Sequence, residues 1–330
     1  MYMKKNIAVV GCGHWGKNLV RNFSDLGNLA AVCDPNAEVA QKYADQYLVK
    51  NCSFSEILHD LSIEGVVLAV PATLHASMAI EVMNAGKHAY VEKPLAMDNL
   101  EAERMIASAE ENGVQLMVGH LLQYHPTFMA LRMLVESGEM GALQYIYSNR
   151  LSFGKVRSEE DVIWSFAPHD ISMILSLTGQ EPDTVRTEST NILQPDIADT
   201  AIVHLEFNSG LKAHISVSWL HPYKEQKLVV VGKKAMAVFD DTKPWGEKLA
   251  LYRHVVRSSG SLPSLEKVEV EYVEVSQSEP LRNECQHFVD VVSGDITPLT
   301  NGKEGLGVLN VLSAASLSQS KNQAVRIENL

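Results

Sequence analysis

Apolar runs and helical patterns alternate along the first 120 residues of this 330-residue chain. Short apolar runs predict buried strands, and apolar residues at helical spacing follow most of them. The predicted strands are residues 7–10, 29–33, 66–70, 88–91 and 114–118, and the predicted helices are residues 17–26, 37–46, 74–84 and 99–112. Continuous apolar runs are typical of parallel strands that are covered on both faces. The alternation therefore predicts an α/β domain with a doubly wound parallel sheet.

A different pattern begins after residue 120, where we place a domain boundary. Runs that are apolar or alternate between apolar and polar residues follow one another, and residues 208–210 form a predicted hairpin turn between two of them. The predicted strands are residues 144–151, 184–190, 201–207, 211–219, 227–231 and 235–239, and the predicted helices are residues 126–137, 168–177, 281–292 and 304–319. The Ser/Gly/Pro-rich residues 257–267 are a predicted surface loop. We expect a second α/β domain, residues 121–330, with an open and mostly antiparallel sheet.

One face of such a sheet packs on helices, and the other face needs a cover. Apolar Val203 and Leu205 alternate with Ile202, His204 and Glu206 in one predicted strand of this domain. Face-to-face packing between subunits would cover the second face. We therefore expect a homo-oligomer, a dimer or a tetramer, that assembles through the C-terminal sheet.

Composition limits the classes of function. The chain is 46% hydrophobic and 21% charged, which is typical of a globular protein, and its net charge of −12 argues against nucleic-acid binding. Its four cysteines show no CxxC or metal-ligand spacing, so we assign no metal site and expect a reducing compartment. No signal peptide and no membrane span are predicted. We expect a cytoplasmic protein without a membrane partner.

The first predicted strand leads directly into Gly11-x-Gly13-x-x-Gly16 and a helix, which is the dinucleotide-binding arrangement. Gly11 permits the tight turn, Gly13 lets a pyrophosphate approach the backbone, and Gly16 lets the helix pack close to the strand. Asp34 ends the next strand, 18 residues after Gly16, where an acidic residue accepts hydrogen bonds from the ribose of NAD. Asp34 would repel the 2′-phosphate of NADP, so NAD is favoured. The alternative is a plain strand–helix turn in which Asp34 only caps the next helix.

Two residues can carry acid/base chemistry. Lys93 follows the predicted strand 88–91 at its carboxyl end, where open parallel sheets bind ligands, and Pro94 holds it rigidly. His169 follows Pro168, which can start a helix, and an imidazole in the first helical turn would have a lowered affinity for protons. His120 follows the predicted strand 114–118 and could line the same cleft. The alternatives are a surface lysine paired with a glutamate and a structural histidine.

These motifs resemble the glucose–fructose oxidoreductase, inositol dehydrogenase and rhizopine-catabolism (Gfo/Idh/MocA) family. The resemblance rests on the glycine motif, Asp34, residues 69–75, Glu92-Lys93-Pro94 and the downstream His169, and it covers most of the chain. It implies a Rossmann NAD-binding domain, residues 1–120, then a substrate-binding and oligomerisation domain. It also implies that Lys93 and His169 form the acid/base pair of a sugar or cyclitol dehydrogenase.

The resemblance also assigns cofactor contacts. The implied contacts are Gly11, Gly13, His14, Trp15, Gly16, Asp34, Val70, Pro71, Thr73, His75, Glu92, Lys93 and His120. The chain departs from the family pattern at one position. Many members carry an aspartate four residues before the histidine, where this chain has Ser165, and nearby Asp161 and Asp170 stand at other positions. The proton-relay partner of His169 is therefore left open.

Within the family, residues 157–172 and 219–224 look most like the 3-dehydrogenases of UDP-N-acetylglucosamine or its uronate, which serve surface-polysaccharide or lipid A synthesis. A UDP-sugar needs cations for its diphosphate, and aromatic rings can stack on its uracil or sugar. The cationic candidates are Lys155, Arg157 and Lys224, the aromatic candidates are Tyr124 and Trp164, and Lys93 and His169 would hold the reacting hydroxyl. Three alternatives stay open: a free sugar or cyclitol dehydrogenase, an NAD-using glycosidase, and a non-catalytic NAD-binding redox sensor.

Overall fold

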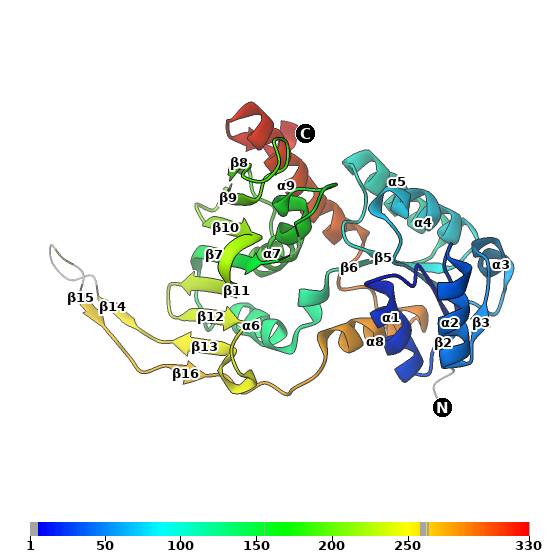
Figure 1. The fold of residues 1–330 in the computed structure, drawn as a ribbon. Coiled ribbons are helices and arrows are strands. Elements are labelled where there is room, and N and C mark those ends of the chain that lie inside the picture. The colour runs from blue at the N-terminus through cyan, green and yellow to red at the C-terminus, as the bar shows by residue number, and fades with distance from the viewer. Residues whose placement is uncertain (1–5, 155, 258–261, 263, 330) are drawn as a thin grey trace. The chain divides into compact units, whose positions relative to one another are not determined.

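The computed structural model describes residues 6–154, 156–257, 262 and 264–329, and its contacts divide the chain into two compact units (Figure 1). The first unit comprises Met1–Tyr124 and Ser278–Leu309, and the second comprises His125–Gln277 and Asn310–Leu330. The sequence placed residues 278–309 in the second domain. The long helix α9, Gly302–Lys321, begins in the first unit and ends in the second.

The first unit contains a six-stranded parallel sheet in the order β3-β2-β1-β4-β5-β6. Its strands are β1 Ile7–Val10, β2 Leu29–Cys33, β3 Lys50–Asn51, β4 Gly65–Leu68, β5 His88–Glu92 and β6 Leu116–Gly119. Its helices are α1 Gly16–Asp25, α2 Ala37–Tyr47, α3 Phe54–His59, α4 His75–Asn84, α5 Asn99–Asn112 and α8 Pro280–Val292, with 3₁₀ turns η1 Ala72–Leu74 and η2 Leu121–Tyr124. This strand order brings a topological switch point to the carboxyl ends of β1 and β4, where ligands bind in such sheets. The predicted fold class of this part is confirmed, although the short strand β3 was not predicted.

Helices α2, α3 and α5 of this unit begin at side chains that cap them. Asn36 accepts hydrogen bonds from the amides of Glu38 (3.0 Å) and Val39 (3.3 Å) at the start of α2. Ser53 and Glu56 form a reciprocal capping box on α3. Each cap satisfies amides that the helix itself leaves unpaired, which contributes about 1 kcal/mol.

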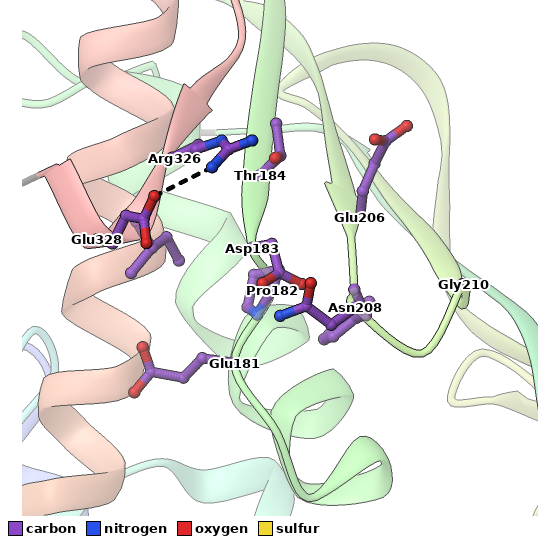
Figure 2. A pocket seen from close by; sticks show the side chains of 11 residues that line it. Glu181, Pro182, Asp183, Thr184, Glu206, Asn208, Gly210, Arg326 and Glu328 are labelled. Atoms are coloured by element: carbon purple, nitrogen blue, oxygen red, sulfur yellow. Dashed lines mark hydrogen bonds and ion pairs between the residues drawn. The ribbon is translucent and has the colours of Figure 1, made fainter.

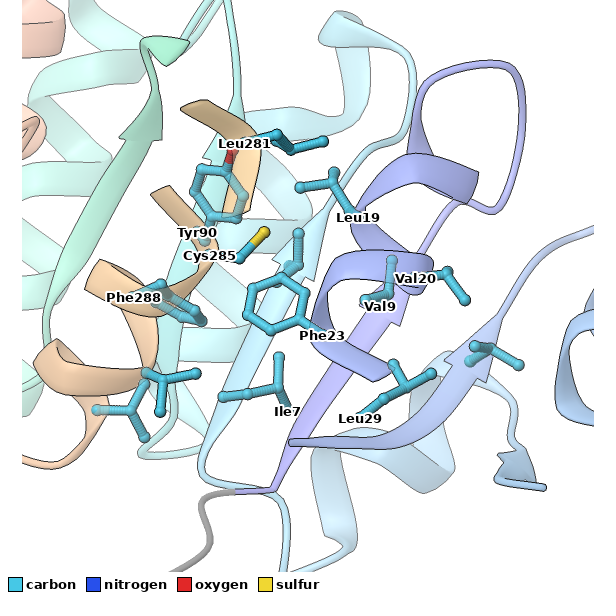
Figure 3. Packing of buried hydrophobic residues seen from close by; sticks show 14 of the residues in the cluster. Ile7, Val9, Leu19, Val20, Phe23, Leu29, Tyr90, Leu281, Cys285 and Phe288 are labelled. Atoms are coloured by element: carbon cyan, nitrogen blue, oxygen red, sulfur yellow. The ribbon is translucent and has the colours of Figure 1, made fainter. Parts of the chain in front are cut away.

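Helix α8 completes the hydrophobic core of the first unit (Figure 3). Its Phe288 meets Phe23 of α1 edge-on, with ring centroids 6.2 Å apart, and Tyr90 of β5 at 5.6 Å. An added Cβ on Gly65 of β4 would lie 3.0 Å from Phe288. Fully burying a side chain of this size stabilises the fold by about 1.5–3 kcal/mol. The amphipathic pattern predicted the helix, but it could not indicate which sheet the helix covers.

The second unit contains a nine-stranded sheet in the order β16-β13-β12-β11-β7-β10-β9-β8-β17. Within the described residues, β7 and β10 pair in parallel and the other neighbours are antiparallel. Its strands are β7 Leu143–Phe153, β8 Thr184–Thr190, β9 Thr200–Glu206, β10 Lys212–Ser218, β11 Leu220–Gly232, β12 Met236–Asp240, β13 Leu249–Tyr252, β16 Glu271–Tyr272 and β17 Val325–Arg326. The predicted open, mostly antiparallel sheet is confirmed. Strands β13, β16 and β17 were not predicted.

Helices α6, Pro126–Glu136, and α7, Val162–Thr178, belong to this unit, and α7 packs on β7, β9 and β10. On β9 the side chains of Val203 and Leu205 are buried, whereas His204 and Glu206 are exposed, as the alternation predicted. Short 3₁₀ turns lie at Trp245–Glu247 (η3) and Ile327–Asn329 (η4). No helix in the described part of the chain combines the length and the apolar character that spanning a membrane requires.

Two predicted elements differ in the structure. Helix α7 begins at Val162 rather than at Pro168, because Asp161 caps it by accepting hydrogen bonds from the amides of Ile163 and Trp164, both at 3.0 Å. The segment predicted as a loop, residues 257–267, includes strand β15 Ser264–Glu266 and the last residue of β14 Val255–Arg257, and these two strands pair as a short hairpin. Residues 258–261 and 263 of this segment lie outside the described residues.

A buried network fixes the first helix of the second unit to its sheet. The Nδ1 atom of His125 accepts a hydrogen bond from the amide of Thr127 (3.1 Å), which leaves Nε2 to carry the proton toward Asp241 at 3.3 Å. Asp241 also pairs with Lys248 at 2.6 Å. Burial alone raises the pKa of Asp241, but the hydrogen bonds from His125 and Lys248 outweigh it and lower the pKa to about 2.

We predict that Asp241 makes the second unit sensitive to acid. Because its pKa is lowered on folding, its contribution is complete above the unfolded pKa of about 3.9 and is lost as the pH falls through about 2. Asp241→Asn should lower the free energy of unfolding by about 2 kcal/mol at pH 7, and the difference should shrink between pH about 4 and 2. Urea unfolding followed by circular dichroism measures this difference, with Asp196→Asn, an exposed position, as the control. A difference that does not change with pH would contradict the assignment.

Candidate functional site

The glycine-rich turn after β1 is closed by backbone contacts that admit no side chain. Gly11 has a φ of +89°, and a Cβ atom there would lie 2.4 Å from the carbonyl oxygen of Ala69. A Cβ atom on Gly16 would lie 1.8 Å from the carbonyl oxygen of Gly11. By contrast, a Cβ atom on Gly13 would meet nothing within 4 Å. Gly11 and Gly16 therefore serve the packing of the turn, whereas Gly13 faces open space where a ligand can approach.

Asp34 holds this turn from the neighbouring strand. Its carboxylate accepts hydrogen bonds from the amide of Cys12 at 2.7 Å and from the amide of Asn36 at 2.9 Å. Burial raises the pKa of the Cys12 thiol to about 12, with a smaller contribution from Asp34, so this cysteine is a packing residue and not a nucleophile. Asp34 lies at the carboxyl end of β2, beside the glycine turn, as the motif predicted.

Helix α1 begins at Gly16 with an open N-terminus. Its N-cap residue Trp15 makes no side-chain capping bond, and no acidic residue occupies the first turn. The backbone amides there carry the positive end of the helix dipole, which suits a pyrophosphate. The exposed side chains of His14 and Trp15 border this turn. The open space at Gly13, the uncapped helix and Asp34 together fit NAD.

His75 ties the loops after β4 and β5 together. Its Nδ1 atom lies 2.7 Å from the carbonyl oxygen of Pro94, and its Nε2 atom lies 3.0 Å from that of Val70. The side chain is 1% exposed, and burial lowers its pKa. His75 thus supports the loops of the predicted cofactor site from behind. Pro71 and Thr73 are also predicted cofactor contacts. Both are exposed, and they lie in the segment between Val70 and His75.

Glu92 connects the end of β5 to the glycine turn. Its Oε1 atom accepts a hydrogen bond from Trp15 Nε1 at 2.6 Å and one from the Tyr90 hydroxyl at 3.3 Å. Burial raises the pKa of Glu92, while the bond from Trp15 and the charge of Lys93 act in the opposite direction. Lys93 is partly exposed directly after β5, and its bond to Pro94 is cis. The structure therefore brings Trp15, Glu92 and Lys93 to one edge of the parallel sheet.

A buried carboxyl group that senses the charge of Glu92 was not predicted. Glu284 of α8 is 1% exposed, and burial raises its pKa well above the usual value, with a further contribution from the charge of Glu92. A glutamate on the apolar face of an amphipathic helix was the only signal in the sequence that could have indicated it.

His120 and Tyr124, predicted to line the site, are both buried in the first unit. His120 is 1% exposed and its Nδ1 atom lies 2.6 Å from Glu304 of α9. Tyr124 is 3% exposed, its hydroxyl lies 2.9 Å from the hydroxyl of Thr300, and burial raises its pKa above the usual range. The ring of Tyr124 is part of the hydrophobic core, which does not favour the predicted stacking on a substrate.

In the second unit, His169 lies within helix α7 and not at its start. Counting from Val162, it is seven residues into the helix, about two turns. The helix dipole acts mainly within the first turn, so the predicted place of His169 in that first turn is wrong. The predicted helix start at Pro168 misled that expectation, because Pro168 stands inside the helix. His169 is partly exposed, although its Nδ1 atom is buried.

The predicted substrate residues of the second unit have mixed surroundings. Trp164 donates from Nε1 to the hydroxyl of Ser316 at 2.8 Å, so one edge of its ring is held by α9. Arg157 is exposed and lies 3.7 Å from Glu160, which leaves its guanidinium largely in solvent. Lys155 lies outside the described residues.

A cavity of about 700 Å³ in the second unit lies apart from these residues (Figure 2). Glu181, Asp183 and Glu206 line it, together with Arg326, which pairs with Glu328 at 3.1 Å. None of the predicted site residues lines this cavity, and its acidic walls do not suit a diphosphate. In the first unit, the candidate cofactor site is therefore formed by the residues at the carboxyl edge of the parallel sheet, and in the second unit His169 stays a predicted site residue.

Comparison with known proteins gives two family matches. Residues 5–120 match the model of the "Oxidoreductase family, NAD-binding Rossmann fold", and residues 128–238 match the GFO/IDH/MocA C-terminal domain. The chain is 28% identical to a UDP-N-acetylglucosamine 3-dehydrogenase of Acidithiobacillus ferrooxidans, covering 91% of this chain and 93% of that protein. It is 23% identical to an inositol 2-dehydrogenase of Rhizobium meliloti, covering 98% and 100%. A solved structure of the Acidithiobacillus ferrooxidans enzyme superposes with a TM-score of 0.86, at 27% identity and over 97% and 98% of the two chains.

These matches confirm the predicted fold class and the prediction of an NAD-binding oxidoreductase. When bound, NAD supplies the hydride acceptor. The residues that would hold it are the glycine turn, Asp34 and the loops after β4 and β5, because these combine open backbone amides with a carboxylate at the expected position.

We predict that Gly13→Ala separates NAD binding from folding. The added methyl group meets no protein atom, so the melting temperature should stay within about 2 °C of the wild type. The same methyl group would occupy the space of the pyrophosphate, so the Kd for NAD should rise at least about tenfold. Isothermal titration calorimetry measures the Kd. Gly246→Ala, which also meets no atom, is the matched control, and Gly16→Ala should unfold the domain. Wild-type affinity in Gly13→Ala would contradict this placement of the cofactor.

Proposed function

Because this chain belongs to the Gfo/Idh/MocA oxidoreductase family, we propose that it oxidises the C3 hydroxyl of a nucleotide sugar, with NAD as the oxidant. UDP-N-acetylglucosamine, or its uronate, is the proposed substrate. The observation that carries this proposal is the similarity to a UDP-N-acetylglucosamine 3-dehydrogenase, which extends over nearly the full length of both chains. The glycine turn and Asp34 support the same chemistry, because they suit a dinucleotide that lacks a 2′-phosphate. NAD is therefore the proposed oxidant rather than NADP.

Lys93 and His169 are the proposed acid/base residues. His169 takes the proton of the C3 hydroxyl as the hydride leaves C3, and the imidazole must be neutral to do so. Lys93 donates a hydrogen bond to the same oxygen and stabilises its developing negative charge. Both side chains are partly exposed, as groups that touch a substrate must be. The product is a 3-keto sugar, which is released or reduced again.

The remaining proposed contacts bind the nucleotide part of the substrate. Arg157 has its guanidinium in solvent and can pair with a diphosphate, and Lys155 follows the same strand end in the sequence. Trp164 is partly exposed and can stack on the uracil or the sugar. Tyr124 is not carried into this proposal, because its ring is buried.

The proposed setting is the synthesis of surface polysaccharides or lipid A, in which the keto sugar would pass to an aminotransferase. The four cysteines are free thiols, which supports a reducing compartment such as the cytoplasm.

A free sugar or cyclitol is the second candidate substrate. The similarity to an inositol 2-dehydrogenase, which also covers the chain from end to end, favours it. The two candidates differ in the diphosphate, so the contribution of Arg157 separates them.

The outer face of the nine-stranded sheet supports assembly with a second copy of this chain. Partly buried apolar side chains of β7, β11 and β12 stand side by side on it: Tyr145 and Tyr147, Val229 and Val231, and Met236 and Val238. The neighbouring strands β10, β9 and β8 add the charged side chains of Lys212, Glu206 and Arg186. The face therefore has positive and negative side chains beside its apolar strip. A self-complementary surface of this kind suits an isologous homo-oligomer interface.

We predict that Val229→Glu separates the subunits, because it places a charge at the centre of the apolar strip. Light scattering coupled to size exclusion should give an oligomer for the wild type and a monomer for the variant. Leu61→Glu introduces the same charge at an exposed apolar position of the first unit and should leave the mass unchanged. An unchanged oligomer in Val229→Glu would contradict assembly through this face.

We predict NAD-dependent oxidation of UDP-N-acetylglucosamine or its uronate, with little oxidation of myo-inositol or glucose. Absorbance of NADH at 340 nm measures it. Lys93→Ala and His169→Ala should each lower kcat by about 100-fold or more, because each removes a group that acts on the transition state. Arg157→Ala should instead raise KM for the UDP-sugar. Retained turnover in both Lys93→Ala and His169→Ala would refute the assigned roles.

The alternatives give different outcomes in the same assay. A preference for inositol or glucose would identify a free sugar or cyclitol dehydrogenase. Net hydrolysis without net NADH would indicate an NAD-using glycosidase, and NAD binding without turnover of any sugar would indicate a redox sensor.

A further inference from the structure

A buried charge pair lies next to His169 and has no role in the function described so far. Asp170 follows His169 directly in helix α7, and its side chain is 1% exposed. Arg150 of β7 contacts it at two points, with Nε 2.6 Å from Oδ2 and Nη2 3.2 Å from Oδ1. The hydroxyl of Ser148, two residues earlier on β7, also donates to Oδ1.

The position of this pair is unusual for the sheet. Strand β7 places Ile146, Ser148 and Arg150 on the face that meets α7, and Ile146 and Ser148 are completely buried. An arginine in this register costs desolvation free energy unless a partner neutralises it. Asp170 is that partner. A buried ion pair is by itself weak evidence that the fold is stabilised. Stability alone therefore does not explain why Arg150 and Asp170 are placed here.

Helix α7 is weakened at Pro168, two residues before Asp170, where the pair holds it. Pro168 has no amide hydrogen, so the carbonyl of Trp164 loses its hydrogen bond within the helix, and the ring disfavours a straight continuation. The backbone at His169 is therefore less constrained by the helix than that of a residue elsewhere in α7. The two-point contact of Asp170 with Arg150 restores the constraint from the sheet, one residue beyond His169.

We propose that Arg150, Asp170 and Ser148 position His169 for its part in the reaction. The inference rests on the proposed function of His169 and goes beyond it. Asp170 takes the place, as an anchor, of the aspartate that this chain lacks at Ser165, but it acts through the backbone of α7 and through its charge. It is a positioning residue, because its carboxylate is fully engaged with β7 and is inaccessible to a substrate.

The pair acts by geometry and by charge, and three variants separate the two. Asp170→Asn keeps the shape but leaves the Arg150 guanidinium uncompensated against helix α7, at the residue that follows His169. Arg150→Lys keeps the charge but loses the two-point contact. The double variant Arg150→Met/Asp170→Asn removes both charges together with the contact.

The experiment measures kcat, KM and the acidic limb of the pH profile of kcat/KM for these variants. Each variant should lower kcat about tenfold or more with a smaller change in KM, because misplacing a catalytic group by an ångström can cost about 100-fold. In Asp170→Asn the acidic limb should move about 0.5–1 pH unit lower, because the uncompensated cation disfavours a charged imidazole. In Arg150→Lys and in the double variant the limb should stay at the wild-type pH while kcat stays low. Wild-type kcat and an unmoved limb in Asp170→Asn would overturn the proposal.

Two controls keep the result interpretable. Asp241→Asn breaks another buried charge pair of the same unit, and it should lower the melting temperature without changing kcat or the pH profile at a temperature where the protein is folded. If Asp170→Asn does not fold, Ser148→Ala and Arg150→Lys carry the test, because each leaves the charge of Asp170 in place. Wild-type kcat in both would overturn the proposal.

A readout without substrate separates this inference from the proposed function. The ring proton of His169, assigned by its loss in His169→Gln, can be titrated by NMR in the protein without NAD. Its titration midpoint should fall in Asp170→Asn and return in the double variant, whether or not His169 is the base. Retained turnover in His169→Gln would refute the proposed function alone, whereas an unmoved midpoint would refute the positioning pair alone.

Discussion

The close approach of the backbone between Gly11 and Gly16 is the constraint on which the first unit depends. A single methyl group at Gly16 would lie 1.8 Å from the carbonyl oxygen of Gly11, so helix α1 can leave the strand at this angle only because neither residue has a side chain. Asp34 then secures the turn through the amide of Cys12. Beside this turn, α1 begins without a side-chain cap, so the positive end of its dipole suits the pyrophosphate of a dinucleotide. Packing and cofactor binding are thus consequences of one backbone geometry.

The function that we propose requires the second unit to hold the imidazole of His169 in place, within a helix that contains a proline. Asp161 starts α7 early enough that His169 lies two turns inside it, and the sheet then supplies the constraint that Pro168 removes. The Arg150–Asp170 contact costs desolvation free energy, and in our proposal it fixes the position of His169. The first unit supports its lysine in a comparable way, since His75 joins the loops on either side of the site and Glu92 fastens the end of β5 to Trp15.

Local patterns predicted most of the fold. The apolar runs of the parallel sheet and the glycine spacing depend on near neighbours, and they placed β1, β2 and α5 at their observed bounds. The contacts that decide the site are non-local, and the sequence did not indicate them: Arg150 meets Asp170 across a strand and a helix, and α8 returns from residue 280 to the first core. A polar residue in the buried register of a strand is the one local signal that could have revealed Arg150, because it demands a partner.

A crystal structure with NAD and a UDP-sugar tests the central claim most directly. The account predicts that the oxygen on C3 of the sugar lies about 3 Å from both Lys93 Nζ and a ring nitrogen of His169, while the pyrophosphate of NAD rests on the amides beside Gly13. A sugar bound with its C3 hydroxyl remote from these two side chains, or a coenzyme bound away from the glycine turn, would contradict it.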